Sequence, residues 1–202
     1  MISSVVIGLT GPSGAGKTTV ASLMSSMGCF VIDADKVARD IVKLDQCKQK
    51  LIDEFGGSIY FNGQLNRKEL AKRAFSTLSK TRKLNQITHP YIVQQISTLV
   101  NESKSLNNDI IVIDAAVLFE SGMDSICDKV IAILAPKEVR LKRIMNRDII
   151  SKSDALLRIN AQNAHEYYTS RADYVVDGTH ISSSIISELI AKILEAVNAG
   201  NN

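Results

Sequence analysis

The sequence contains one segment whose chemistry can be read directly, Gly11-Pro12-Ser13-Gly14-Ala15-Gly16-Lys17-Thr18, with Thr19 behind it. It fits the pattern G-x-x-x-x-G-K-[ST] at every position. The apolar run Val5–Leu9 precedes it, and an amphipathic helical pattern follows. Glycines allow backbone N–H groups to turn inward around an anion, and a helix start adds its positive dipole end. The segment therefore predicts a phosphate-binding loop, and an ordinary glycine-rich turn is the weaker alternative.

Short apolar runs without alternation recur along the rest of the chain. Strands that are covered by helices on both faces have this pattern, because both of their sides must be apolar. Helical patterns lie between the runs, so strand and helix alternate. We predict an α/β, three-layer fold with a five-stranded parallel sheet from the runs Val5–Leu9, Cys29–Ile32, Ile110–Ile113, Val130–Leu134 and Tyr174–Val176.

Residues 35–108 interrupt the alternation, because they show helical patterns and no convincing strand. Asn66-Arg67-Lys68-Glu69 resembles a capping box at the start of one helix. Pro90 is expected to separate a helix that ends near Thr88 from the next one. We predict one domain over residues 1–202, with a core of residues 1–34 and 109–202 and a helical insert at 35–108.

Composition argues against several functional classes, although a local basic face stays possible. The net charge is only +3, which gives no broad electrostatic case for nucleic acid. The three cysteines, Cys29, Cys47 and Cys127, form no C-x-x-C pair, which argues against a disulfide framework or a zinc site and suits a reducing compartment. The start of the chain lacks the features of a signal peptide, and no apolar run is long enough to cross a membrane. We therefore expect a cytoplasmic protein with no membrane partner.

A phosphate loop alone does not distinguish a kinase from a switch protein. Guanine-specific switches normally carry N-K-x-D after a late strand, and the sequence has no such segment. A small-molecule kinase needs an acidic group to orient the acceptor hydroxyl and cations to neutralise the transferring phosphoryl group. Asp33 follows the second strand, where ligands bind in parallel sheets. Asp35, two residues on, is more simply the N-cap of the next helix.

Cations occur in the run Arg140-Leu141-Lys142-Arg143-Ile144-Met145-Asn146-Arg147. A solvated helix face is the ordinary explanation of such a run, and a lid with Arg147 as an arginine finger is the functional one. Lys17 has the reach for the β and γ phosphates of ATP, and the Thr18 hydroxyl is a candidate Mg²⁺ ligand. Asp114, at the end of the third strand, fits a Walker-B-like position near that magnesium, although a structural carboxylate fits nearly as well.

The chain resembles the dephospho-coenzyme A kinase family over almost its whole length. The resemblance is carried by the phosphate loop, Val31-Ile32-Asp33-Ala34-Asp35 with Ala38-Arg39, Gly63-Gln64-Leu65-Asn66-Arg67, His89-Pro90, Leu118-Phe119-Glu120, Arg147-Asp148 and Val176-Asp177. It implies transfer of a phosphoryl group from ATP, with Mg²⁺, to the ribose 3′-hydroxyl of dephospho-coenzyme A. It also implies the strand order 2-3-1-4-5 and a lid at about residues 140–165.

The resemblance assigns roles to individual residues. Asp33 matches the base that takes the hydroxyl proton, and Arg143 and Arg147 match lid arginines near the nucleotide. Asp177 matches a position near the adenine. The acceptor site is matched by Arg39, His89, Leu118 and Glu120. By itself, His89 would more often be a structural residue at a helix end. We expect a monomer or weak homo-oligomer.

The chain departs from the family pattern at four places. Pro12-Ser13 stands where Gly-Ile is common, and Thr18 where Ser is frequent. Ala116-Val117 replaces a common Pro-Leu, and Asp177-Gly178 replaces a common Asp-Asn near the adenine. Two other functions remain open from the residues alone. One is a kinase for another nucleotide or small alcohol, and the other is a nucleotide-gated binding protein that uses the helical insert as its partner surface.

Overall fold

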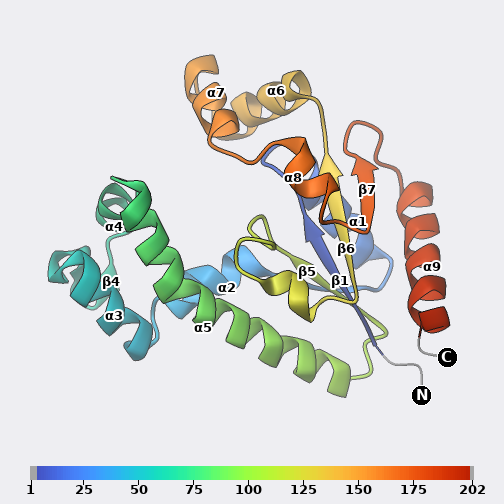
Figure 1. The fold of residues 1–202 in the computed structure, drawn as a ribbon, viewed down its shortest axis with the longest axis horizontal. Helices are drawn as coiled ribbons and strands as arrows, with labels where there is room; N and C mark the ends of the chain where they lie inside the picture. Colours follow the sequence, from blue (N-terminus) through green and yellow to red (C-terminus); the bar gives the residue numbers. More distant parts are fainter. Residues whose placement is uncertain (1–3, 201–202) are drawn as a thin grey trace. The chain divides into compact units, whose positions relative to one another are not determined.

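The computed structural model describes residues 4–200, and its centre is a five-stranded parallel sheet (Figure 1). The strands are β1 (Val5–Thr10), β2 (Phe30–Asp33), β5 (Ile110–Asp114), β6 (Lys129–Leu134) and β7 (Tyr174–Asp177). They lie in the order β2-β5-β1-β6-β7. Counted along the chain this is the order 2-3-1-4-5, so the predicted sheet is confirmed.

The register of the central strands brings their carboxyl ends to one edge of the sheet. Leu9 of β1 lies beside Asp114 of β5, and Thr10 lies beside Ala132 of β6. All six residues of β1 are buried, as expected for the middle strand of a sheet covered on both faces. Groups that follow β1 and β5 therefore start from neighbouring points.

Helices cover both faces of the sheet. The helices α1 (Lys17–Ser26) and α9 (Ser183–Gly200) pack on one face, where Val20, Met24 and Ile186 join the core. On the other face, α8 (His165–Thr169) packs on β6 through Tyr168, and the 3₁₀ turn η2 (Met123–Ile126) contacts β1. The molecule thus has the three layers that the sequence predicts.

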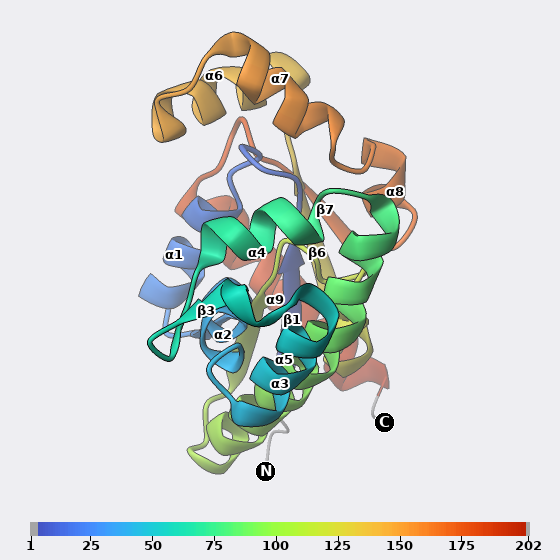
Figure 2. The same cartoon turned by 90° about the vertical axis from the view of Figure 1, so that its left-hand side faces the viewer.

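Two helices after β6 form a pair of their own (Figure 2). The helix α6 (Lys137–Asp148) begins after Pro136, and Ile149, with φ of 52°, ends it. The helix α7 (Lys152–Asn160) starts at Ser151, whose hydroxyl accepts a hydrogen bond from the Asp154 N–H. Ile144 of α6 packs against Ala155 and Ile159 of α7, so a small apolar cluster holds the pair together.

The chain forms two compact units. One contains the sheet and includes the chain up to Ile32 and from Val100 on, and the other is Asp33–Leu99. The second unit contains α2 (Ala34–Ile41), α3 (Asp45–Phe55), η1 (Gly57–Ile59), β3 (Tyr60–Phe61), β4 (Gln64–Leu65) and α4 (Arg67–Ala74). The long helix α5 (Leu78–Ser105) begins in it and ends in the first unit.

A hairpin in the second unit corrects the prediction that residues 35–108 contain no strand. β3 and β4 pair antiparallel around Asn62-Gly63. Both turn residues have positive φ, 49° at Asn62 and 77° at Gly63, as the two-residue turns of tight hairpins require. The Asn-Gly pair was the available signal, but strands of two residues are too short to show any periodicity.

The predicted break at Pro90 is also wrong, because α5 runs through this residue. Proline removes one backbone donor, whereas the helix continues past it and buries Ile92 and Ile96. Packing of that apolar face outweighs the local penalty of the proline. Asn66 does cap α4, since its side chain accepts from the Glu69 N–H at 3.1 Å.

Candidate active site

The segment between β1 and α1 forms a tight loop with glycines where no other residue fits. Gly11 has φ of 145°, and a Cβ there would lie 2.2 Å from the carbonyl oxygen of Ile133. Gly16 has φ of 113°, and its Cβ would lie 2.8 Å from Ile181. The Ala15 N–H donates to the Pro12 carbonyl at 3.1 Å, which closes the turn. The loop conformation therefore depends on the glycines at these positions.

The loop ends at the start of α1, where Gly16 is the N-cap and makes no side-chain hydrogen bond. The first N–H groups of any helix lack partners within the helix. Here no capping side chain competes for them, so a bound anion would be their natural acceptor. The arrangement has the form of the predicted phosphate site.

Lys17 and Asp114 form an ion pair beside this loop. The Lys17 ammonium donates to Asp114 Oδ1, and each side chain is only 14% exposed. The pairing follows from the sheet, because Asp114 ends β5 at the level of Leu9 in β1. Thr18, one residue after the lysine, is exposed. The Thr18 hydroxyl and the Asp114 carboxylate are each of a chemical type that suits Mg²⁺.

Arg143 and Arg147 of α6 both contact the loop. The Arg143 guanidinium donates to the carbonyls of Gly14 at 3.2 Å and Ala15 at 3.1 Å. Arg147 donates to the Ser13 hydroxyl at 3.2 Å. It also donates twice to Asp148, at 2.8 and 2.9 Å, and this hydrogen bonding raises the pKa of Arg147. The structure thus brings both predicted arginines to the phosphate loop.

Arg140, on the same face of α6, is a site residue that the sequence analysis missed. It is 4% exposed and donates to the Ser13 carbonyl at 3.0 Å and to the Gln162 side chain. Arg140, Arg143 and Arg147 have the i, i+3, i+7 spacing of one helix face, which was the available signal. The run is therefore not merely a solvated surface.

Asp177 ends β7, and Gly178 begins a turn that touches the loop. Asp177 accepts from the Thr179 N–H at 2.8 Å and hydroxyl at 2.7 Å, which lowers its pKa to about 2. A Cβ at Gly178 would lie 1.8 Å from the Ala15 carbonyl oxygen, so only glycine fits there. The Gly178 carbonyl in turn accepts from Arg143 at 2.9 Å. The departure from the family pattern at this position has a steric reason in this chain.

The segment Leu118-Phe119-Glu120 lies over the sheet face that carries α8. Leu118 is completely buried, and its side chain is what a Cβ at Gly8 would meet. The Glu120 carboxylate accepts from Asn163 at 2.6 Å. Burial and then the charge of Glu120 raise the pKa of Tyr168 to about 12. In this structure Leu118 packs the segment into the core, whereas the Glu120 side chain makes polar contacts.

Asp33 begins the second unit and has a structural role of its own. Its Oδ1 accepts from the Lys36 N–H at 2.9 Å, and its Oδ2 lies 3.8 Å from the Arg39 guanidinium. Asp33 is therefore the N-cap of α2, and the expected cap at Asp35 is wrong, because Asp35 already lies inside the helix. The Arg39 carbonyl accepts from Arg67 at 3.1 Å, which links the predicted acceptor residue to α4.

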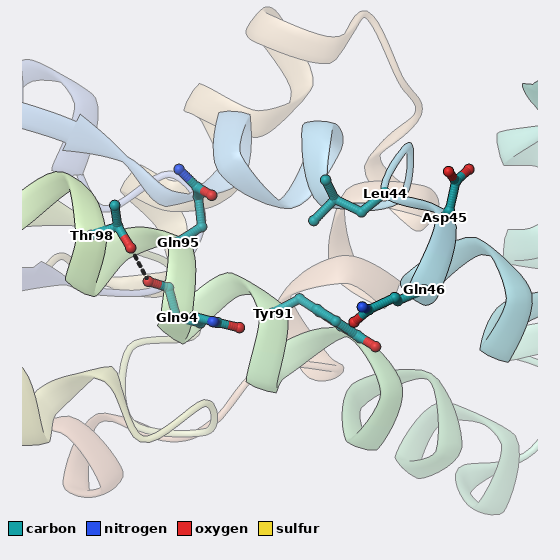
Figure 3. Close-up of a pocket in the computed structure, with 7 residues that line it drawn as sticks. All are labelled: Leu44, Asp45, Gln46, Tyr91, Gln94, Gln95 and Thr98. Carbon is teal, nitrogen blue, oxygen red and sulfur yellow. Dashed lines mark hydrogen bonds between the residues drawn. The ribbon is translucent and has the colours of Figure 1, made fainter.

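The second unit also contains a pocket of about 430 Å³ (Figure 3). Its lining comes from the start of α3 and from α5, namely Leu44, Asp45, Gln46, Tyr91, Gln94, Gln95 and Thr98. None of these residues was predicted as a site residue. A second pocket of about 230 Å³ is mostly apolar and includes Ala38, Arg67, Leu70, Phe75 and Thr88. His89, a predicted acceptor residue, lies next to Thr88 in α5.

A parallel sheet of this order, with a phosphate loop after its middle strand and a helix of arginines bound to that loop, defines a P-loop kinase. The model of the dephospho-CoA kinase family matches residues 5–183. The chain belongs to this family.

Individual proteins agree with the family match. The dephospho-CoA kinase of Carboxydothermus hydrogenoformans is 39% identical over 181 residues, which cover 89% of this chain and 88% of that protein. The structure of a dephospho-CoA kinase from Campylobacter jejuni has a TM-score of 0.66 at 28% identity and covers 98% of both chains. The crystal structure of TT1252 from Thermus thermophilus has a TM-score of 0.77 at 29% identity, covering 96% of this chain and 97% of that one.

Proposed function

We propose that this chain transfers the γ-phosphoryl group of ATP to the ribose 3′-hydroxyl of dephospho-coenzyme A and so completes the synthesis of coenzyme A. The observation that carries the proposal is the phosphate loop with Lys17 at its end and the α6 arginines on its backbone. Membership of the dephospho-CoA kinase family supports the choice of acceptor.

The nucleotide side of the reaction rests on the first unit. The loop N–H groups and the start of α1 would hold the triphosphate, with Lys17 at the β and γ phosphates. Lys17 is already directed by Asp114, so its ammonium starts in a defined position. Arg143 and Arg147 add two positive charges beside Lys17. Arg147 is accessible to a ligand, since 58% of its side chain is exposed. These charges would stabilise the phosphoryl group as it leaves ADP.

The acceptor side is proposed to rest on Asp33. Its carboxylate would orient the ribose hydroxyl and accept its proton while the oxygen bonds to the γ-phosphorus and the bond to ADP breaks. The Arg39 guanidinium lies 3.8 Å from Asp33 Oδ2, and we propose that it binds a phosphate of the acceptor. His89 and Glu120 are proposed acceptor contacts, and Leu118 would shape the segment that presents Glu120.

Magnesium fits the proposed site. No cluster of three or more His, Cys, Asp or Glu side chains capable of holding a metal is found within residues 4–200. Mg²⁺ often uses only one or two protein oxygens together with substrate phosphates, and Thr18 and Asp114 supply that number. When bound, the ion would neutralise charge on the β and γ phosphates.

A coupled assay tests the proposal directly. Purified protein with ATP and dephospho-coenzyme A should form ADP and coenzyme A in equal amounts. Turnover of other nucleosides in place of dephospho-coenzyme A would reject the acceptor and favour a different small-molecule kinase. ATP binding without turnover of any acceptor would favour the nucleotide-gated binding protein. Lys17→Ala is the negative control for the loop, and activity that survives it would contradict the nucleotide site.

The cellular location and the oligomeric state are two further expectations for a protein with this function. No helix among residues 4–200 is long and apolar enough to span a membrane. The cytoplasmic location and the monomer or weak homo-oligomer stay predictions, and light scattering over a range of protein concentrations tests the second.

A further inference from the structure

Arg140 is held in a way that sets it apart from the other two arginines on its helix face. It is 4% exposed, whereas the Arg147 side chain is 58% exposed. Its Nε donates to the Ser13 carbonyl at 3.0 Å, and its Nη2 donates to Gln162 Oε1. Arg140 is therefore enclosed by the protein, and its guanidinium bonds to protein acceptors.

Burial of the Arg140 guanidinium costs free energy, and its hydrogen bonds must offset that cost. Both acceptors are neutral oxygens, one a backbone carbonyl and one an amide. Burial lowers the pKa of Arg140, although a guanidinium stays protonated in proteins. A buried cation that is bonded to neutral oxygens contributes little to the stability of a fold, because removing the charge from water costs free energy. The two hydrogen bonds of Arg140 therefore point to a role other than stability.

The two acceptors belong to parts of the chain that are far apart in sequence. Ser13 lies in the phosphate loop, and Gln162 lies two residues after the end of α7 at Asn160. The backbone of α6 also touches the loop here, since a Cβ at Gly14 would lie 2.9 Å from the Arg140 carbonyl oxygen. One guanidinium thus joins the backbone of the loop to the segment where the chain returns from the α6–α7 pair.

We propose that Arg140 is a positioning residue that fixes the phosphate loop to the base of the α6–α7 lid through Ser13 and Gln162. The proposal rests on the proposed function only in taking the loop ligand to be ATP. With both bonds in place, the Ser13 carbonyl is held by Arg140 while Arg147 donates to the Ser13 hydroxyl from the same helix. Loss of the guanidinium would leave the loop to be ordered by the nucleotide, so ATP would bind more weakly.

The test compares Arg140→Met with Arg140→Lys. The methionine variant should raise the Kd and KM for ATP by about tenfold, as expected when a hydrogen bond to a charged group is lost, and leave the KM for dephospho-coenzyme A unchanged. The lysine variant should recover part of the loss, because an ammonium can bond Ser13 or Gln162 but lacks the fork that bonds both. Arg82→Met, at an exposed arginine of α5, is the matched control and should change neither constant.

Gln162→Leu tests the second contact. It should weaken ATP binding less than Arg140→Met, and the double variant should be no weaker than Arg140→Met alone, because the two side chains act as one unit. Additive losses would contradict the bridge. Should Arg140→Met fail to fold, the lysine and leucine variants still decide, because a bridge predicts weaker ATP binding in both.

The affinity for ATP is measured by calorimetry without acceptor, so it does not depend on the proposed reaction. A wild-type enzyme that ignores dephospho-coenzyme A would end the proposed function and leave this inference standing. A folded Arg140→Met variant with an unchanged Kd and a lower melting temperature would overturn the inference, since Arg140 would then be a structural residue only.

Discussion

Asp33 has two tasks that a single substitution can separate. In the structure its carboxylate caps α2 by accepting from the Lys36 N–H. In the proposed reaction the same carboxylate removes a proton from the acceptor. Asparagine is as good an N-cap as aspartate but is not a base at neutral pH. The fold and the chemistry therefore respond differently to Asp33→Asn.

We expect Asp33→Asn to lower kcat by about 10²-fold or more, the contribution of a general base, with little change in ATP affinity or melting temperature. Steady-state kinetics and thermal unfolding measure the two effects. Asp35→Asn, inside the first turn of the same helix, is the control and should retain most activity. Full turnover in Asp33→Asn would remove Asp33 from the mechanism.

We expect the turn after β7 to lose stability in acid. Hydrogen bonds from Thr179 lower the pKa of Asp177 to about 2 from its ordinary 3.8. Because the folded pKa lies below the unfolded one, the stabilisation is complete above the unfolded pKa. It is lost as the pH falls through the folded value.

We predict that Thr179→Val raises the pKa of Asp177 toward its ordinary value, because valine keeps the N–H donor and removes the hydroxyl donor. An NMR titration of the side-chain carboxyl carbon measures the shift. Thr98→Val, which removes a hydroxyl that donates to the Gln94 carbonyl, is the control and should leave Asp177 unchanged. An unaltered titration in Thr179→Val would mean that another group depresses the pKa.

Among the secondary-structure elements, α5 differs most from its sequence expectation. Its 28 residues continue through Pro90, where the expected boundary is absent. A proline inside a helix interior removes one hydrogen bond and crowds the preceding turn. The helix therefore carries a local penalty that the packing of Ile92 and Ile96 outweighs.

Replacement of this proline should accordingly stabilise the protein. We expect Pro90→Ala to raise the free energy of unfolding by about 1–3 kcal/mol, because alanine restores the missing donor. Urea denaturation measures the change, and Arg82→Ala on the same helix corrects for the helix preference of alanine. A fall in stability would indicate that the proline suits the local backbone and that the helix is interrupted there.

At the scale of the whole molecule, the proposed site residues are distributed over two compact units of the chain. The phosphate loop, Asp114 and the α6 arginines belong to the unit with the sheet. Of the residues proposed for the acceptor, Asp33, Arg39 and His89 belong to Asp33–Leu99, whereas Leu118 and Glu120 belong to the unit with the sheet. If the proposed function is correct, ATP contacts the first unit and the acceptor draws most of its proposed contacts from the second.

Hydrogen exchange can separate these units. A non-hydrolysable ATP analogue alone should slow amide exchange at residues 11–19, whereas dephospho-coenzyme A alone should slow exchange within 33–99. In Lys17→Ala the first protection should disappear and the second should remain. Protection by dephospho-coenzyme A that is confined to the first unit would contradict the acceptor site proposed around Asp33 and Arg39.

The sequence by itself determined the sheet and the phosphate loop. Five apolar runs became the five strands, because burial on both faces leaves a pattern within each run. The glycines and Lys17 could equally be recognised from the sequence, because the residues that form the phosphate loop are consecutive. Arg147 stood out as a candidate arginine finger in a run of cations, whereas Arg143 was assigned to the nucleotide only by the resemblance to the dephospho-coenzyme A kinase family.

Only the tertiary structure decided which partners those residues have. The contact of Arg140 with Ser13 spans 127 residues, and that of Lys17 with Asp114 spans 97. Neither leaves a local pattern, since each depends on how distant strands and helices pack. The continuity of α5 through Pro90 and the need for glycine at position 178 are of the same kind. Local rules describe what a segment prefers, whereas packing against the rest of the chain determines what it adopts.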